Sequence, residues 1–294
     1  SRHRYRAYRS AGCPRTKCRA GLILVVHASP SVCEGRRRLR LLDVFSGTAT
    51  LCKRGETSAP FLVHISIVSE KSESIAIADL MAQSGVGFGT SGARGLAEAM
   101  TDRVCYLYTI GFLQFLERDG AIHPGDRVAI AADYRPSSPR ISAACAAAID
   151  DLGYVALNCG NVPSPALSNL AYAEAYASLM VTGSHNPKSD NGLKLTLGTA
   201  SLYGDQITSL RSQIEGGDFV DDSGQFIEAR TMPEEDGTAY RRYVARYLDF
   251  FPDGCLSGKR VIVYEHSSVA ARAMTEVFAG LGADVVRRGY SESF

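Results

Sequence analysis

The sequence lacks any long apolar run. Hydrophobic residues make up 45% of the 294 positions, but no stretch approaches the roughly 18 apolar residues that a membrane-spanning helix needs. We therefore expect no membrane partner. With 21% charged residues, the composition is typical of an ordinary globular chain.

Cysteine spacing that would indicate a metal site or a disulfide framework is also missing. Cys13 and Cys18 form a pair without a second pair at zinc-site spacing, and the cysteines from 105 to 255 are scattered singly through apolar segments. We predict neither structural zinc nor a disulfide network. Reduced thiols are expected, as in a cytoplasmic protein.

Acidic residues are scarce at the beginning of the chain. The first 54 residues contain eleven Arg and two Lys against Glu34 and Asp43, a formal charge of +11, whereas residues 55–294 carry −10. The same segment shows no helical or strand period. The opposite charge balance indicates that this basic head and the remainder do not share one fold.

Three interpretations of the basic head, residues 1–74, compete. It is a targeting leader, a basic arm for nucleic acid, or extraneous sequence upstream of the natural start that remains disordered. No methionine precedes Met81, which favours the third interpretation. We therefore expect no nucleic-acid partner, and we expect deletion of residues 1–70 to leave the thermal midpoint unchanged.

Helical and strand patterns alternate from Thr101 onward. The predicted helices cover 104–116, 138–152, 164–176 and 206–214, and the predicted strands cover 128–131, 155–157, 177–181 and 193–197. This alternation predicts an α/β fold, a three-layer αβα domain with a mainly parallel mixed sheet, over residues 85–217.

A similar alternation of predicted helices and strands recurs near the end of the chain. A polar stretch, 218–237, is expected to be a linker or excursion, followed by a helix over 238–250, a strand over 260–264, a helix over 269–281 and a strand over 283–286. We expect residues 238–294 to be the start of a second domain of the same plan.

The string MVTGSHNPKSDNGLKL, residues 180–195, contains candidate catalytic side chains: a hydroxyl, an imidazole and an amine. Turn residues after the predicted strand 177–181 lift Ser184 out at the carboxyl end of that strand, where open α/β sheets bind ligands. Taken alone, Ser184 is a capping residue and Lys194 a solvated strand lysine. A serine hydrolase with Ser184 as nucleophile and His185 as base is an alternative, but the string lacks the second Gly of a G-x-S-x-G elbow.

Three motifs in order carry a family resemblance. TGSHNP with NGLKL, preceded by GFGTSGARG at 87–95 and DRVAIAADYRPSSPRI at 126–141, resembles the α-D-phosphohexomutase superfamily of phosphomannomutases and phosphoglucomutases. The resemblance runs from about Gly85 to the end of the chain. It implies that Ser184 carries the transferable phosphoryl group, that His185 is its catalytic partner, and that Lys194 and Arg94 are catalytic cations of the same pocket.

The resemblance also implies substrate-binding residues and cofactors. Asn186, Asp133 and Arg135 match substrate-binding positions, although Ala132 stands where the family usually has arginine, which leaves the role of that arginine unfilled. Mg²⁺ is the implied cofactor, held through the phosphate on Ser184, and a hexose 1,6-bisphosphate is the implied activator.

The implied reaction interconverts hexose 1-phosphate and hexose 6-phosphate, with mannose or glucose as the sugar. The family's DGDGDR magnesium loop and RPSGTEP phosphate loop do not occur in this sequence. We therefore expect this chain to be an amino-terminal part that does not complete turnover alone. A catalytically silent remnant, or a binding module with a nucleic-acid-binding head, is the alternative.

Overall fold

The computed structural model describes residues 49–50, 62–63, 72–89, 92–197, 200–201, 213–217 and 219–291. The chain divides into two compact units, Ser1–Ser72 and Glu73–Phe294. In the first unit the described residues are two short antiparallel strands, β1 (Ala49–Thr50) and β2 (Leu62–Val63). The predicted disorder of the basic head otherwise falls outside the described residues.

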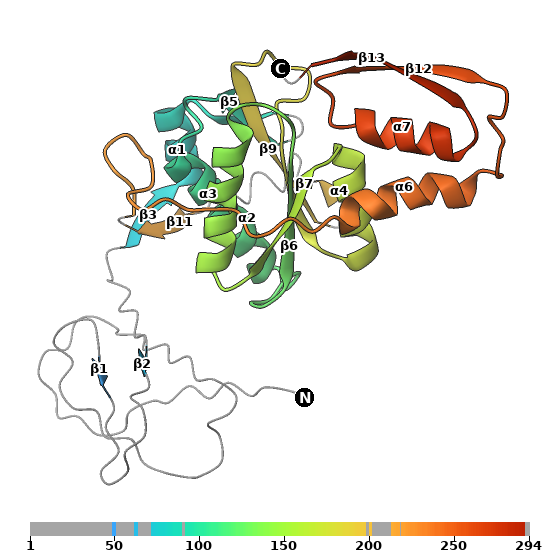
Figure 1. Ribbon diagram of the computed structural model, residues 1–294. Coiled ribbons are helices and arrows are strands. Elements are labelled where there is room, and N and C mark those ends of the chain that lie inside the picture. Colours follow the sequence, from blue (N-terminus) through green and yellow to red (C-terminus); the bar gives the residue numbers. More distant parts are fainter. Residues whose placement is uncertain are drawn as a thin grey trace, which may run out of the picture. The chain divides into compact units, whose positions relative to one another are not determined.

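A mixed sheet forms the centre of the second unit (Figure 1). Its strand order is β4-β5-β9-β8-β6-β7, with β10 paired to β9. Strands β8, β6 and β7, which lie side by side and end at the β7 edge of the sheet, are parallel, and β4 and β9 run opposite to the other strands. The strands are β4 (Gly87–Gly89), β5 (Gly92–Leu96), β6 (Arg127–Ala132), β7 (Val155–Asn161), β8 (Ala177–Val181), β9 (Asp190–Leu197) and β10 (Ala200–Ser201).

Helices cover both faces of this sheet. The helices are α1 (Ile77–Ser84), α2 (Asp102–Arg118), α3 (Ser138–Asp151) and α4 (Ser164–Glu174). Because side chains alternate along a strand, Val128 and Ile130 of β6 pack with α2 and α3, while Ala129 and Ala131 pack with α4. The predicted α/β fold with a mainly parallel mixed sheet is confirmed.

Several elements were not expected from the sequence, among them the short strands β4, β5 and β10, helix α1 and strand β11 (Gln213–Gly217). Helix α1 precedes residue 85, where the predicted domain began, and its Ile77 and Leu80 are buried in the α2 and α3 core. Of the predicted helix 206–214, residues 206–212 lie outside the described residues. Residues 213 and 214 instead begin strand β11, which pairs with β3 (Ser72–Ala76). The segment is a strand because β3, which is distant in the sequence, supplies its hydrogen bonds.

The connecting segment, residues 219–237, packs on the sheet domain. Phe219 and Phe226 lie against the Tyr106 ring of α2, with ring centroids 4.3 and 5.9 Å away. The Phe226 N–H donates to Asp102 Oδ2 at 3.0 Å, and farther along the Asp236 N–H donates to the carbonyl of Asn158 at 2.7 Å. The predicted excursion is thus a strap held by backbone hydrogen bonds and aromatic contacts (Figure 1).

A second strand-helix-strand unit follows the strap. Its elements are α6 (Thr238–Phe250), β12 (Arg260–His266), α7 (Ala271–Gly280) and β13 (Asp284–Tyr290). The two strands are parallel, as a crossover through α7 requires. Val244 of α6 packs with Ala273 and Val277 of α7.

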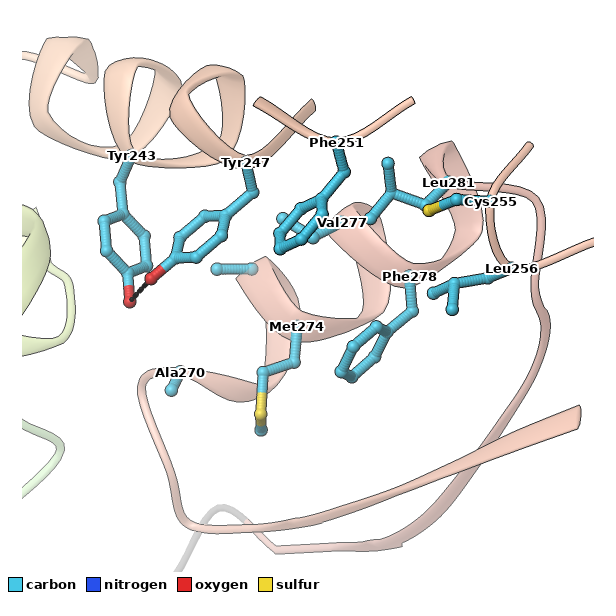
Figure 2. Close-up of a pocket in the computed structure, with 11 residues that line it drawn as sticks. Tyr243, Tyr247, Phe251, Cys255, Leu256, Ala270, Met274, Val277, Phe278 and Leu281 are labelled. Carbon is cyan, nitrogen blue, oxygen red and sulfur yellow. Dashed lines mark hydrogen bonds between the residues drawn. The ribbon is translucent and has the colours of Figure 1, made fainter. Parts of the chain in front are cut away.

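An apolar hollow of about 380 Å³ opens between α6 and α7 (Figure 2). Tyr243, Tyr247 and Phe251 line one side, and Met274 and Phe278 line the other. Its lining contains no charged side chain. A phosphosugar needs cationic and hydrogen-bonding partners, so this hollow does not suit one.

Candidate functional site

The candidate site lies where β6 and β8 end. These strands are adjacent and parallel, so their carboxyl ends meet at one edge of the sheet. The chain leaves β6 through α3 on one face and enters β8 from α4 on the other face. This arrangement is a topological switch point, the position at which open α/β sheets bind ligands.

Ser184 stands on the loop after β8 in an unusual backbone conformation. Its φ is 56°, in the left-handed region that non-glycine residues seldom adopt. Its N–H donates to Thr182 Oγ1 at 2.9 Å, and its side chain is exposed to solvent. The loop therefore fixes the backbone of Ser184 and leaves the hydroxyl accessible.

Asp133 follows β6 and lies beneath this loop. Its carboxylate accepts hydrogen bonds from the hydroxyls of Thr182 and Ser138 at 2.7 and 2.8 Å, and from the Arg135 N–H and Nε–H at 3.1 and 3.2 Å. Asp133 is 9% exposed. Its described contacts are with the protein, and contact with a sugar stays a prediction.

Arg135 is among the most deeply buried large side chains of the described residues. It is 1% exposed, although arginine is seldom fully buried. Its guanidinium donates to Asp133 and to the carbonyls of Ser184, Asn186, Pro187 and Asp190 at distances of 2.5 to 3.2 Å. Substrate contact by Arg135 also stays a prediction.

The two other predicted cations lie on one face of the sheet. Arg94 of β5 pairs in register with Gly192 of β9, and Lys194 stands two residues farther along β9, opposite Met180 of β8. Residues two apart on a strand face the same side, which here is the α4 side. Arg94 and Lys194 therefore approach the site from the same face.

Arg94 reaches the loop itself. Its guanidinium donates to Asn186 Oδ1 at 3.3 Å, and Asn186 Nδ2 donates to Asp190 Oδ2 at 3.0 Å. A Cβ at Gly192 would lie 3.0 Å from Arg94 Cγ and 2.7 Å from the carbonyl oxygen of Ala93. The absence of a side chain at Gly192 thus leaves room for Arg94 to pass.

His185 is exposed on the same turn as Ser184. No hydrogen bond between the Ser184 hydroxyl and the His185 imidazole occurs in the part of the loop that the structure describes, residues 182–190. The segment after Ser184 leads into strand β9, whereas a hydrolase nucleophile elbow leads from a strand into a helix. The geometry disfavours the serine hydrolase alternative.

Metal-ligating side chains do not gather in the described part of the chain. Within it, no three His, Cys, Asp or Glu residues lie in a group that could hold a metal ion. These residues therefore do not form a protein metal centre by themselves. Nor is any described helix both long and apolar enough to cross a membrane.

Sequence reasoning missed three residues that build the site. Thr182 links Ser184 to Asp133, Ser138 binds Asp133 from α3, and Asn191 Nδ2 donates to Ser138 Oγ at 3.1 Å. Thr182 stands within TGSHNP, and its position two residues before Ser184 is typical of a hydroxyl-capped turn. Ser138 and Asn191 carry no local signal, because their partners are distant in sequence.

Comparison with known proteins gives a family match for the sheet domain. Residues 85–221 match the family model described as phosphoglucomutase/phosphomannomutase, alpha/beta/alpha domain I. The chain belongs to the phosphohexomutase superfamily, of which it carries the amino-terminal portion. The family resemblance drawn from the three motifs is thereby confirmed.

Two phosphomannomutases are among its relatives. The chain is 38% identical over 213 residues to one from Sinorhizobium fredii, covering 71% of this chain and 44% of the relative. It is 35% identical over 217 residues to one from Salmonella muenchen, covering 74% and 43%. The chain thus spans less than half the length of these curated relatives.

A solved structure shows the same fold. The phosphoglucomutase/phosphomannomutase family protein of Burkholderia thailandensis aligns with a TM-score of 0.51 at 25% identity, over 68% of this chain and 43% of that one. The α/β domain of this chain therefore has the fold of that phosphoglucomutase/phosphomannomutase family protein.

Proposed function

We propose that Ser184 accepts a phosphoryl group and returns it to a hexose phosphate during interconversion of the 1- and 6-phosphates. The observation that carries this proposal is the exposed Ser184 hydroxyl on a loop whose backbone is fixed at the switch point. A phosphorylated serine is a stable ester, so the hydroxyl serves as a reversible carrier.

Cationic side chains would stabilise this phosphoserine. A phosphoserine carries a charge of about −1.5 to −2 and three acceptor oxygens. Arg94 already contacts the loop at Asn186, and Lys194 lies on the same sheet face. We assign these two side chains and His185 to charge stabilisation, and Lys194 also to proton transfer at the reacting sugar hydroxyl.

The names of the relatives support a choice of substrate. Because two relatives are named phosphomannomutase, we propose mannose phosphates as substrates, with glucose phosphates as the alternative, and a hexose 1,6-bisphosphate as activator. A third relative, from Kineococcus radiotolerans, is named phosphoglucosamine mutase and is 32% identical over 205 residues.

Magnesium would neutralise the phosphate, and the ligand from this chain would be a phosphate oxygen on Ser184. We place the enzyme in the cytoplasm.

Labelling with a radioactive hexose 1,6-bisphosphate tests the proposal. After incubation of the 294-residue chain, peptide mass spectrometry should locate the phosphate on Ser184, and Ser184→Ala should remain unlabelled. Ser189, an exposed hydroxyl on the same loop, provides the matched control, since Ser189→Ala should label normally. An unlabelled chain, label on another residue, or equal labelling of Ser184→Ala would contradict the assignment.

A further inference from the structure

We propose that Arg135 is a positioning residue for Ser184 and does not bind the phosphosugar. The inference rests on the proposed function, because it concerns how the phosphoryl-accepting hydroxyl is held. It assigns Arg135 a role different from the substrate contact that the family resemblance implies.

Hydrogen-bond capacity is the first argument. A guanidinium has five N–H donors and no acceptor. In Arg135, Nε donates to Asp133 Oδ2, Nη1 donates to the carbonyls of Pro187 and Asp190, and Nη2 donates to those of Ser184 and Asn186. All five donors therefore have a protein partner, and the side chain is fully shielded from solvent.

The second argument is that both peptide groups of Ser184 are held by one connected network. Arg135 binds the Ser184 carbonyl at 3.2 Å, and Thr182 Oγ1 accepts from the Ser184 N–H at 2.9 Å. Thr182 in turn donates to Asp133, which accepts from Arg135. A left-handed non-glycine residue persists only where its surroundings fix it, and this network does so.

Charge balance is the third argument. The Arg135 guanidinium lies 3.2 Å from Asp133 Oδ2, and the two side chains are 0% and 11% exposed. A buried cation paired in this way has its charge compensated inside the protein. The phosphate on Ser184 would then be bound by cations on the accessible side of the loop, such as Arg94. Arg135 would determine the position of that phosphate through the backbone of Ser184.

Kinetics of Ser184 phosphorylation separate positioning from substrate binding. Arg135→Lys removes the fork of five donors and should therefore misplace the Ser184 hydroxyl. Because misplaced reacting groups react more slowly, we expect the maximal labelling rate to fall about 10- to 100-fold. The half-saturating bisphosphate concentration should stay unchanged. Arg140→Lys is the matched control, because Arg140 likewise joins a carboxylate to backbone carbonyls, but its hydrogen-bond partners are Asp102, Ala97 and Met100, outside the loop of Ser184.

Hydrogen exchange provides a readout that does not depend on phosphorylation. Amides of residues 184–190 should exchange faster in Arg135→Lys and not in Arg140→Lys. A raised half-saturating concentration with unchanged maximal rate and unchanged exchange would overturn the proposal in favour of substrate binding. If the unsubstituted chain takes no label, the proposed function fails, while loop exchange still decides the positioning role.

A second pair of variants applies if Arg135→Lys does not fold. Thr182→Val removes the hydroxyl between Asp133 and the Ser184 N–H, whereas Thr182→Ser keeps it. We expect faster exchange at Ser184 and slower labelling in Thr182→Val, with both restored in Thr182→Ser. Identical behaviour of the two variants would contradict the network.

Discussion

At the scale of single residues, Gly183 is required by the close approach of Arg135. A Cβ at position 183 would lie 2.4 Å from Arg135 Cζ and 2.5 Å from Nε, and that guanidinium cannot withdraw without losing its loop partners. The lack of room for a Cβ therefore requires glycine at position 183. Its backbone conformation does not, since Gly183 is not among the residues with positive φ.

Gly183→Ala should therefore lower the free energy of unfolding by roughly 1–3 kcal/mol, the usual cost of overpacking. The thermal midpoint would fall by about 2–4 °C for each kcal/mol. Gly87→Ala is the control, because its Cβ would make an ordinary contact of 3.6 Å with Met81. Equal midpoints for the two variants in calorimetry would contradict the steric argument.

Among the described residues, three buried thiols, those of Cys105, Cys145 and Cys159, have a raised pKa and make the free energy of unfolding depend on pH. Burial raises the pKa of Cys145 to about 12, and burial together with Asp236 and Glu235 raises the pKa of Cys159 to about 12. An unfolded cysteine titrates near pH 8.5, so above that pH the unfolded chain loses protons that the folded chain keeps. The contribution of these thiols to the free energy of unfolding is therefore fully present below about pH 8.5. It declines as the pH rises toward 12.

Urea unfolding at pH 7.5, 9 and 10 should thus show a falling free energy of unfolding, with each thiol contributing at most about 1.4 kcal/mol per pH unit. Cys159→Ala should flatten this decline. A decline of the same slope in Cys159→Ala would exclude the thiol as its source.

At the scale of elements, the strap 219–237 lies on α2 through its aromatic residues. Phe226 packs against Tyr106 and its N–H binds Asp102, whereas the neighbouring side chain of Ile227 is 69% exposed. Tyr106 also donates to Asp151 at 3.1 Å, which joins α2 to the end of α3 beneath the strap. The strap is therefore part of the packed structure despite its polar sequence.

Phe226→Ala should destabilise the strap by about 1–3 kcal/mol, less than for a fully buried phenylalanine because Phe226 is only partly buried. Amide exchange should quicken in residues 219–230 and remain unchanged in the loop 182–190. Ile227→Ala is the matched control and should change neither. Loss of protection throughout the sheet would show instead that the strap supports the entire core.

At the scale of the whole molecule, a hexose bisphosphate has two phosphate groups to neutralise. Under the proposed function, the loop of Ser184 would bind one of them, and neither the DGDGDR nor the RPSGTEP string occurs in the sequence. Loss of one preorganised charge-stabilising group already costs about 10²- to 10³-fold in rate.

We therefore expect residues 1–294 to take up phosphate on Ser184 without completing the conversion of mannose 1-phosphate to mannose 6-phosphate. A coupled assay with magnesium and a bisphosphate activator measures this conversion. A full-length phosphomannomutase in the same assay is the positive control. Turnover by the 294-residue chain near that of the control would refute the expectation.

Local patterns predicted most of the elements of the second unit. Strand β8 and helix α6 have the bounds that the sequence predicts, Ala177–Val181 and Thr238–Phe250, because apolar period and turn residues mark both ends. Helix α1 was missed, since its eight residues lie next to the basic head and bury their apolar face only against a distant core. Strand β11 was missed because its partner, β3, is far away in sequence.

The sequence by itself determined that Ser184 follows a buried strand, and its motifs determined the family. Only the tertiary structure decided how that serine is held. Asp133 and Arg135 are about fifty residues from Ser184 in the chain, and they reach its loop because β6 and β8 are neighbours in the sheet. A motif specifies residue types, whereas burial, donor geometry and the space at Gly183 arise when separate strands pack together.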